Sequence, residues 1–341
     1  MRDGPTPLTA HMLAAWSSGD AGLVADFLAS VRRYQASTWT RPASKPGVLL
    51  QFGTMQLLDY GLKSGKPILV IPSLINPSWV LDLLPDNSLM AWLVNQGFRP
   101  LMIDWGVPDA FSRSLDMNAV VEQLLVPALA AIGTPVPLLG YCLGGTLAVA
   151  LAAHSPDRVS ALALMATPWA WSGYDTESRR KLGQLMHTWE PALNQLGVLP
   201  AEQLQMLFAH LDPQLIVRKF AKFADVEAGS HAEHTFFAME DWSNTGPPLA
   251  APVARQLFGD WIAHGINGWP GIDLSTLVMP ALVITASADR IVPETTTRPL
   301  ASALTKVTHM PVAAGHVGMV VGAKASELLW EPLTAWLQAI D

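Results

Sequence analysis

The stretch GYCLGGTL, residues 140–147, contains the only cysteine of the chain, Cys142. A cysteine thiolate is a strong nucleophile that can form a thioester with an acyl group. Gly140 and Gly144 flank Cys142 at a distance of two residues on either side. This spacing is typical of the sharp turn that presents a nucleophile between a buried strand and a helix, because side chains at the flanking positions would collide with these elements. Taken alone, the pattern also allows a cysteine that packs as a small hydrophobic residue.

Two later segments supply the residue types that activate such a nucleophile. Asp289 follows the apolar run 280–287, and His316 follows the run 307–312. A histidine can deprotonate the thiol, and a carboxylate can orient the histidine and stabilise its cation. The order of nucleophile, acid and base along the chain is also the order expected when all three residues lie at the ends of strands in one sheet. We therefore predict that Cys142, Asp289 and His316 form a catalytic triad that attacks an activated acyl carbon.

Acyl transfer also needs donors for the negative charge that develops on the carbonyl oxygen. The amide of Leu143 would lie at the N-terminus of the helix after the nucleophile, where backbone donors and the helix dipole favour an anion. A second donor is expected from the loop after the strand 67–71, near Leu74 or Ile75. We predict that these amides form an oxyanion hole.

The elements that must position these residues follow from the spacing of apolar side chains. Two runs around Gly53-Thr54 predict a hairpin of strands 48–52 and 56–60. The later strands are continuous apolar runs, as expected where both faces of a parallel sheet are buried. Predicted strands at 67–74, 99–105, 136–141, 161–167, 280–287 and 307–312 are interspersed with predicted helices at 88–97, 117–132, 143–154, 294–303 and 324–340. This order predicts an α/β fold, with a mostly parallel sheet and helices on both faces.

The alternation of strands and helices stops over residues 170–269. This stretch has no convincing strand, and its helical patterns cover 178–196, 201–210, 213–225 and 250–264. We expect it to form a helical lid inserted into an α/β core made of residues 41–169 and 270–341. Residues 1–40 show helical apolar spacing and are expected to form an N-terminal helical segment.

The composition excludes several classes of function. Half of the residues are apolar, only 14% are charged, and the net charge is −7 without a basic run, so nucleic acid is not expected as a partner. A single cysteine excludes an internal disulfide. The pattern at the N-terminus leads us to expect no signal peptide, and glycines interrupt the apolar stretch 136–154. We therefore expect a cytoplasmic protein without a transmembrane segment.

A few further residues could bind a metal or line a pocket. His231, Glu233 and His234 lie close together on one predicted helical turn, but no further ligand stands out, so we expect no metal and no resident cofactor. Asp104-Trp105 ends a strand at the edge where ligands bind, which is equally compatible with a pocket role and with packing.

Over roughly residues 45–340 the chain resembles a polyhydroxyalkanoate (PHA) synthase of the PhaC type, in the α/β-hydrolase superfamily. The resemblance rests on PSLINPSWVLDLLPDNSLMAWLVNQG (72–97), MIDWGVPD (102–109), LLGYCLGGTL (138–147), MATP (165–168), LPAEQLQMLFAHLDP (199–213), MEDWSNTGPPLAAP (239–252), SADRIVP (287–293) and GHVGMVVG (315–322). It implies Cys142 as nucleophile, Asp289 as acid, His316 as general base, and an α/β-hydrolase fold with an inserted lid that contributes to dimer contacts.

The same resemblance implies an activity and a set of partners. The activity is acyl transfer from 3-hydroxyacyl-CoA, a substrate and not a cofactor, to the hydroxyl end of a growing polyester. The implied partners are a second copy of the chain, a polyester granule surface and a second synthase subunit, because the length is close to that of the short synthases that need one.

Two alternatives stay open. A Cys-dependent hydrolase, such as a thioesterase or esterase, would use the same triad. Dienelactone hydrolases share the Gly-Tyr-Cys-Leu-Gly-Gly elbow, although they are much shorter and lack a hundred-residue insertion. A non-catalytic binding or granule-associated protein could keep the fold, but the complete triad argues against it.

Overall fold

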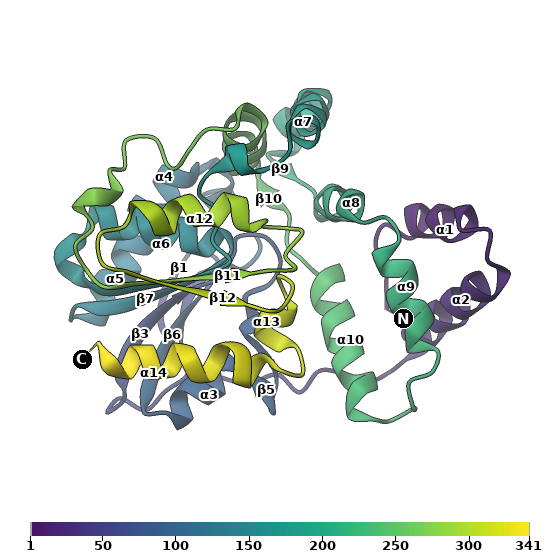
Figure 1. The fold of residues 1–341 in the computed structure, drawn as a ribbon, viewed down its shortest axis with the longest axis horizontal. Coiled ribbons are helices and arrows are strands. Elements are labelled where there is room, and N and C mark those ends of the chain that lie inside the picture. The colour runs from purple at the N-terminus through teal and green to yellow at the C-terminus, as the bar shows by residue number, and fades with distance from the viewer. Residues whose placement is uncertain (1, 341) are drawn as a thin grey trace.

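A central sheet of eight strands organises the computed structural model, which describes residues 2–340 (Figure 1). Across the sheet the strands lie in the order β1 (Gly47–Phe52), β2 (Met55–Asp59), β6 (Phe98–Asp104), β3 (Lys66–Ile71), β7 (Val136–Tyr141), β8 (Val159–Met165), β11 (Ala281–Ala286) and β12 (Val307–Val312). The β1–β2 hairpin and the β2–β6 pair are antiparallel, and the remaining pairs are parallel. The predicted mostly parallel α/β fold is confirmed.

Helices cover both faces of this sheet, as Figure 1 shows. One face is covered by α5 (Val126–Ile132), α6 (Leu143–His154) and α12 (Glu294–Ala303), and the other by α3 (Leu89–Asn95) and α14 (Glu331–Ala339). Along β3, Leu69 and Ile71 belong to the first hydrophobic core, whereas Ile68 and Val70 belong to the second. Successive side chains of a strand point to opposite faces, so a continuous apolar run fills both cores.

Helix ends follow local signals in the sequence. Ser88 caps α3 by accepting a hydrogen bond from the Ala91 N–H at the start of the helix. The predicted helix 117–132 is continuous but contains a π-helical turn between α4 (Met117–Val120) and α5. Smaller elements complete the core: β4 (Asp82–Leu84), β5 (Asn87–Ser88) and α13 (Gly318–Val321).

The chain leaves the sheet after β8 and returns to it at β11. The segment between them contains α7 (Thr176–Leu196), α8 (Ala201–Leu211), α9 (Leu215–Phe223), α10 (His231–Asn244) and α11 (Ala251–Ala254), which continues as a π-helix over Arg255–Ile262. The expectation that this segment has no strand is wrong, because β9 (Val198–Leu199) pairs with β10 (Leu249–Ala250). Strands of two residues are too short to show an alternating pattern.

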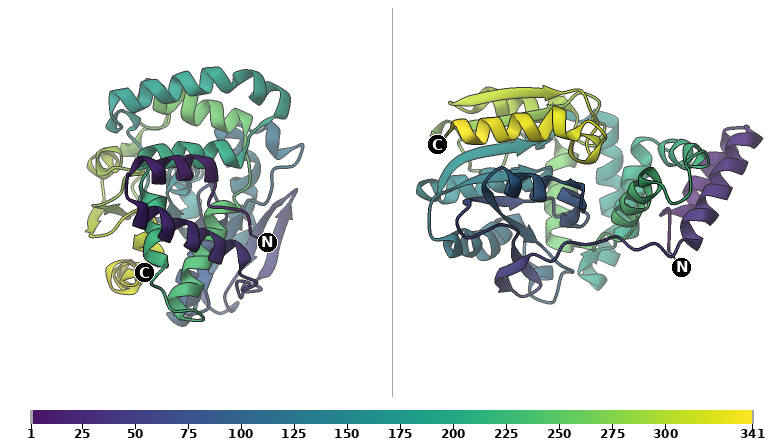
Figure 2. Two further views of the ribbon diagram at one scale, coloured as in Figure 1. Left: turned by 90° about the vertical axis from the view of Figure 1, so that its right-hand side faces the viewer. Right: turned by 90° about the horizontal axis from the view of Figure 1, so that it is seen from below.

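The N-terminal helices α1 (Leu8–Ser17) and α2 (Ala21–Ala36) pack on the inserted segment and not on the sheet (Figures 1 and 2). Asp20 separates them and caps α2 by accepting the Leu23 N–H. Their apolar faces meet α9 and α10 in a third cluster that includes Phe27, Tyr34 and Phe220. We call α1, α2, α9 and α10 the helical assembly.

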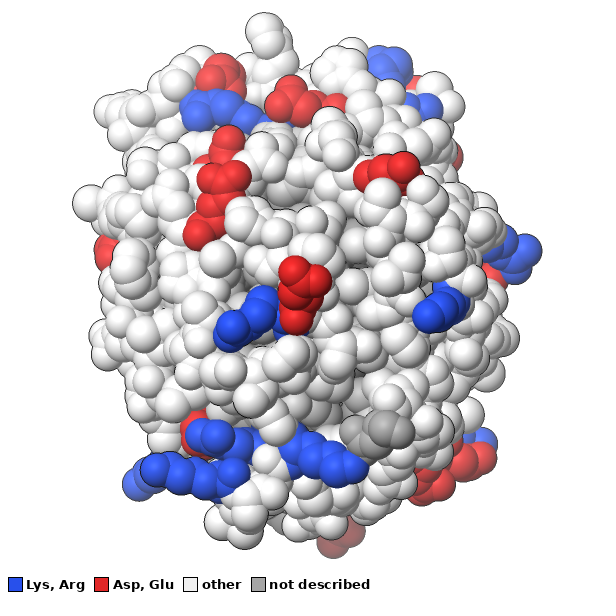
Figure 3. Space-filling view, turned by 90° about the vertical axis from the view of Figure 1, so that its left-hand side faces the viewer, with Lys and Arg blue, Asp and Glu red and all other residues white. Residues whose placement is uncertain are grey.

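The surface reflects the low charge content. On the face opposite the N-terminal helices, Figure 3 shows acidic and basic side chains scattered among uncharged residues. Within residues 2–340, every helix is too short or too polar to span a bilayer.

Candidate active site

Cys142 lies at the tight turn between β7 and α6, with φ 55° and ψ −128°. A positive φ in a residue with a side chain costs about 1–3 kcal/mol and persists only where the surroundings enforce it. A Cβ on Gly140 would lie 2.4 Å from the Gly145 Cα, and one on Gly144 would lie 2.0 Å from the Ile71 carbonyl oxygen. Both glycines are therefore required for the turn, as their spacing predicts.

Asp289 and His316 meet beside this turn, each in the loop that follows its strand. His316 Nδ1 donates a hydrogen bond to Asp289 Oδ2 over 2.6 Å, and both side chains are buried. The other carboxylate oxygen of Asp289 accepts the N–H groups of Ile291 and Val292, each at 2.8 Å. These bonds fix the carboxylate and leave His316 Nε2 for a proton transfer.

The electrostatics of His316 connect it to Cys142. Burial alone would lower the pKa of His316, but negative charge on the Cys142 sulfur, together with hydrogen bonds to Asp289 and Cys142, raises that pKa to about 10. The structure therefore brings Cys142, Asp289 and His316 together. The arrangement is suited to proton exchange between a sulfur nucleophile and an imidazole that a carboxylate holds in place.

The predicted oxyanion donors lie around the same turn. Leu143 is the first residue of α6, where N–H groups lack a partner within the helix. The N-terminus of α6 packs against the end of β3, since a Cβ on Gly144 would also lie 2.5 Å from the Pro72 carbonyl oxygen. The Ile75 N–H donates to Ser73 Oγ over 3.1 Å, so Leu74 is the better candidate of the two loop donors.

Comparison with known proteins places this geometry in a family. A family model described as "alpha/beta hydrolase fold" matches residues 85–323. The chain belongs to the alpha/beta hydrolase fold family. Among solved α/β structures, a putative non-heme bromoperoxidase, BpoC, from Mycobacterium tuberculosis aligns with a TM-score of 0.58 and 16% identity, over 89% of this chain and all of that one. A thermophilic esterase from Thermogutta terrifontis aligns with a TM-score of 0.53 and 19% identity, over 87% of this chain and 98% of that one.

Curated relatives narrow the comparison within this α/β-hydrolase family. A poly(3-hydroxyalkanoate) polymerase subunit PhaC from Haloferax mediterranei is 28% identical over 310 residues, which cover 85% of this chain and 63% of that one. The corresponding subunit from Allochromatium vinosum is 27% identical over 292 residues, or 80% of either chain. The resemblance to PHA synthases that the motifs indicate is confirmed. This α/β-hydrolase spans less than two thirds of the length of the Haloferax protein.

Two tyrosines that the sequence analysis did not single out complete the surroundings of this α/β-hydrolase site. Tyr141 stacks on the His316 ring, with centroids 5.2 Å apart, and its hydroxyl donates to the His316 carbonyl over 3.2 Å. The Tyr174 hydroxyl donates to the Ile291 carbonyl over 2.9 Å. Burial, and then the nearby charges of Cys142 and Asp289, raise the pKa of both phenols far above their usual value. Tyr141 could have been suspected from its place beside Cys142, but Tyr174 lies in no motif.

The other candidates from the sequence have separate partners. His231 pairs with Asp86, Glu233 binds Arg33, and His234 stacks on Trp39, so these three side chains do not converge. Trp105 lines a small apolar groove together with Leu74, Phe111 and Leu249, and its indole N–H donates to the Pro72 carbonyl over 3.2 Å. Trp105 thus both packs and lines a groove.

Proposed function

We propose that this α/β-hydrolase relative is an acyltransferase that moves 3-hydroxyacyl groups from CoA thioesters to a polyester chain through a thioester at Cys142. The observation that carries the proposal is a sulfur nucleophile at the elbow, beside the Asp289–His316 pair, in a chain similar to PHA polymerase subunits over 80–85% of its length. A thiol suits this chemistry because it exchanges readily with the thioester of CoA.

In the first step the Cys142 thiolate attacks the carbonyl carbon of the acyl-CoA. The carbonyl oxygen becomes negative and accepts hydrogen bonds from the Leu143 and Leu74 N–H groups. The bond from this carbon to the CoA sulfur then breaks, and His316 Nε2 gives its proton to the departing thiolate. Asp289 keeps the imidazole oriented and stabilises its cation before that transfer.

In the second step the hydroxyl at the end of the polyester attacks the thioester carbon. His316 Nε2 takes the hydroxyl proton, and Cys142 leaves as a thiolate, which restores the starting state. Water would give a free acid at this stage, so the site must exclude it. The buried rings of Trp171, Trp261 and Trp269, all within the insertion, support this requirement, because Trp171 stacks on Tyr174 beside the site.

The partners belong to the same proposal. Exposed apolar side chains on α1, α9 and the end of α8, namely Leu13, Trp16, Leu211 and Leu215, support a homodimer through the inserted segment. Attachment to a polyester granule and a second synthase subunit remain predictions from the resemblance, and a cytoplasmic location remains a prediction from the sequence pattern.

The decisive experiment incubates the protein with 3-hydroxybutyryl-CoA and follows CoA release and the product together. We expect CoA release with formation of poly(3-hydroxybutyrate), identified by NMR. Release of free 3-hydroxybutyrate instead would establish a Cys-dependent hydrolase. No CoA release across acyl chain lengths, even with a synthase partner subunit added, would refute the acyltransferase.

A further inference from the structure

The loop that follows β3, residues 72–77, is held from outside at both ends. Trp105 donates its indole N–H to the Pro72 carbonyl over 3.2 Å, and Trp242 of α10 donates to the Pro77 carbonyl over 2.8 Å. We call this segment the β3 loop. It contains Leu74, the candidate second oxyanion donor, and its start packs against the N-terminus of α6.

Asn76, near the end of the β3 loop, has an unusual backbone conformation. Its φ is 65°, and within residues 2–340 only Cys142 and Ala166 share a positive φ among residues other than glycine. All three follow the carboxyl ends of strands at the candidate site. Asparagine tolerates this region better than most residues, but it still carries strain that neighbouring contacts must offset.

Those neighbouring contacts come from the inserted segment. Gln205 of α8 donates its side-chain N–H to Asn76 Oδ1 over 3.0 Å, and the Gln205 side chain is buried. Gly246 approaches the same oxygen, since a Cβ there would lie 2.7 Å from it. A buried hydrogen bond between two amide side chains has a defined geometry, so it can hold the β3 loop in one conformation.

We propose that Asn76 and Gln205 are positioning residues that orient the Leu74 N–H toward the oxyanion, so that the inserted segment completes the oxyanion hole. The inference rests on the proposed acyl chemistry at Cys142. Neither side chain belongs to the triad, and the triad geometry does not depend on this hydrogen bond. A loss of the bond therefore affects the steps that build negative charge on a carbonyl oxygen and spares other reactions of the same sulfur.

Two reagents separate these effects at Cys142. Acylation by p-nitrophenyl acetate passes through an oxyanion, whereas alkylation by iodoacetamide displaces iodide and forms none. We expect Gln205→Met to slow acylation by about 10- to 100-fold, in kcat and not in KM, because a small misplacement of a donor is costly. Alkylation should proceed at the wild-type rate. Gln203→Met, which removes an amide from the same helix, is the matched control and should leave both reactions unchanged.

Substitutions at Asn76 separate the hydrogen bond from the backbone conformation. Asn76→Gly keeps the positive φ without strain but removes the acceptor, so it should lose acylation as Gln205→Met does. Asn76→Asp keeps an acceptor oxygen for Gln205 and should therefore retain acylation, unlike Asn76→Gly. The double variant Asn76→Gly/Gln205→Met should be no slower than either single variant, because both remove the same bond.

The outcomes distinguish the inference from the proposed function. Equal losses of acylation and alkylation, or no loss of acylation in Gln205→Met and Asn76→Gly, would overturn the positioning role. If Gln205→Met does not fold, Asn76→Gly decides alone. A wild type that reacts selectively as described but releases no CoA from acyl-CoA would refute the acyltransferase and leave the positioning role standing. A wild type that is alkylated but not acylated would refute both.

Discussion

The candidate site and the helical assembly are stabilised in different ways. At the site, the turn at Cys142 and the loops that carry Asp289 and His316 directly follow strands of one sheet. In the helical assembly, segments about 190–200 residues apart in sequence meet through aromatic rings, such as Phe27 against Phe220, and through the ion pair of Arg33 with Glu233. The comparison teaches that the reactive geometry depends on local strand-to-turn structure, whereas the helical assembly depends on long-range tertiary contacts.

The boundary between the two regions runs through the inserted segment itself. The first hydrophobic core, on the sheet face covered by α5, α6 and α12, includes Met186 of α7, Leu204 of α8 and Val253 of α11. Phe220 of α9 belongs instead to the cluster with the N-terminal helices. Helix α10 joins the regions, because Phe237 packs in the assembly while its neighbours Ala238 and Trp242 pack in the core around α3 and α14. A movement of the assembly would therefore reach the β3 loop through α10.

The largest expected effect comes from the nucleophile. Cys142→Ala should reduce kcat for CoA release by a factor on the order of 10⁶, below detection, because no other side chain at the turn can form the thioester. The helical assembly should stay folded, since the sulfur does not contact it. Thermal unfolding followed by circular dichroism provides the control. Turnover in the Cys142→Ala variant would disprove the nucleophile assignment.

The next effect comes from Asp289. Asp289→Asn should lower kcat on the order of 10³- to 10⁴-fold, because the amide cannot hold the imidazole or stabilise its cation as the carboxylate does. Wild-type His316 should stay protonated until the pH rises through about 10. In the variant the midpoint should move to lower pH, because a hydrogen bond and a charge that favour the cation are lost.

An NMR titration of the His316 ring measures this change directly. The exposed Asp157 provides the matched control, since Asp157→Asn removes a carboxylate far from the imidazole. A midpoint that is the same in Asp289→Asn and in wild type would show that Asp289 does not act on His316.

Much of the site could be predicted because each signal lies within a few residues. The glycine spacing around Cys142 reports contacts that the turn itself creates, and Asp289 and His316 could be found once the strands before them were recognised. The pairing of Asn76 with Gln205 leaves no such signal, because the two residues lie on separate elements 129 positions apart.

The helical assembly shows the same limit on a larger scale. The apolar spacing over residues 8–34 predicts helix, and α1 and α2 are present. Their partners could not be predicted, because an apolar stripe shows that a helix packs but does not show on what. Phe220 could equally have faced the sheet.

The helical assembly should respond most strongly at Phe220. This buried ring contacts Phe27, Tyr34 and Phe236, with centroids 5.0–5.9 Å apart. Phe220→Ala should lower the free energy of unfolding by about 3–5 kcal/mol, measured by urea denaturation. The exposed Lys222 on the same helix provides the control variant Lys222→Ala. Iodoacetamide should still alkylate Cys142 at the wild-type rate in the folded variant, and a large loss of that rate would mean that the two regions are not separable.

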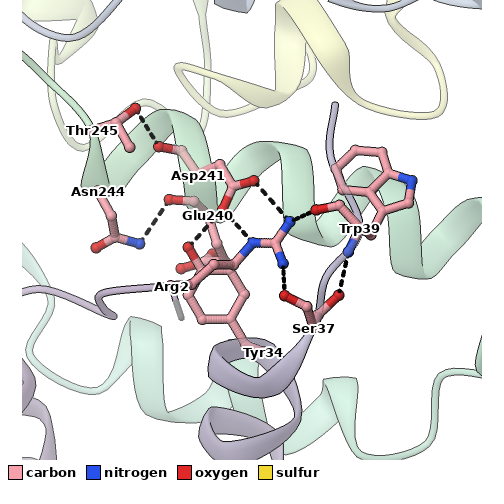
Figure 4. Close-up of polar contacts among 8 residues, drawn as sticks. All are labelled: Arg2, Tyr34, Ser37, Trp39, Glu240, Asp241, Asn244 and Thr245. Atoms are coloured by element: carbon pink, nitrogen blue, oxygen red, sulfur yellow. Dashed lines mark hydrogen bonds and ion pairs between the residues drawn. The ribbon is translucent and has the colours of Figure 1, made fainter. Parts of the chain in front are cut away.

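The smallest effect is expected at Arg2, which ties the N-terminus to α10. Its Nε donates to Asp241 Oδ1 over 2.7 Å and its Nη1 to the Ser37 carbonyl over 2.5 Å, while another N–H reaches the Trp39 carbonyl (Figure 4). The Arg2 side chain is only 12% exposed, so water replaces these bonds poorly. Arg2→Gln should cost on the order of 1–3 kcal/mol of unfolding free energy.

The contrast with an exposed pair makes this last prediction specific. Arg298 and Glu294 form a similar pair on the surface of α12, and Arg298→Gln should have little effect because solvent screens that pair. A double-mutant cycle of Arg2→Gln with Asp241→Asn should show a coupling free energy, since the two side chains share a partly buried contact. Equal costs at Arg2 and Arg298 would show that burial does not strengthen the N-terminal contact.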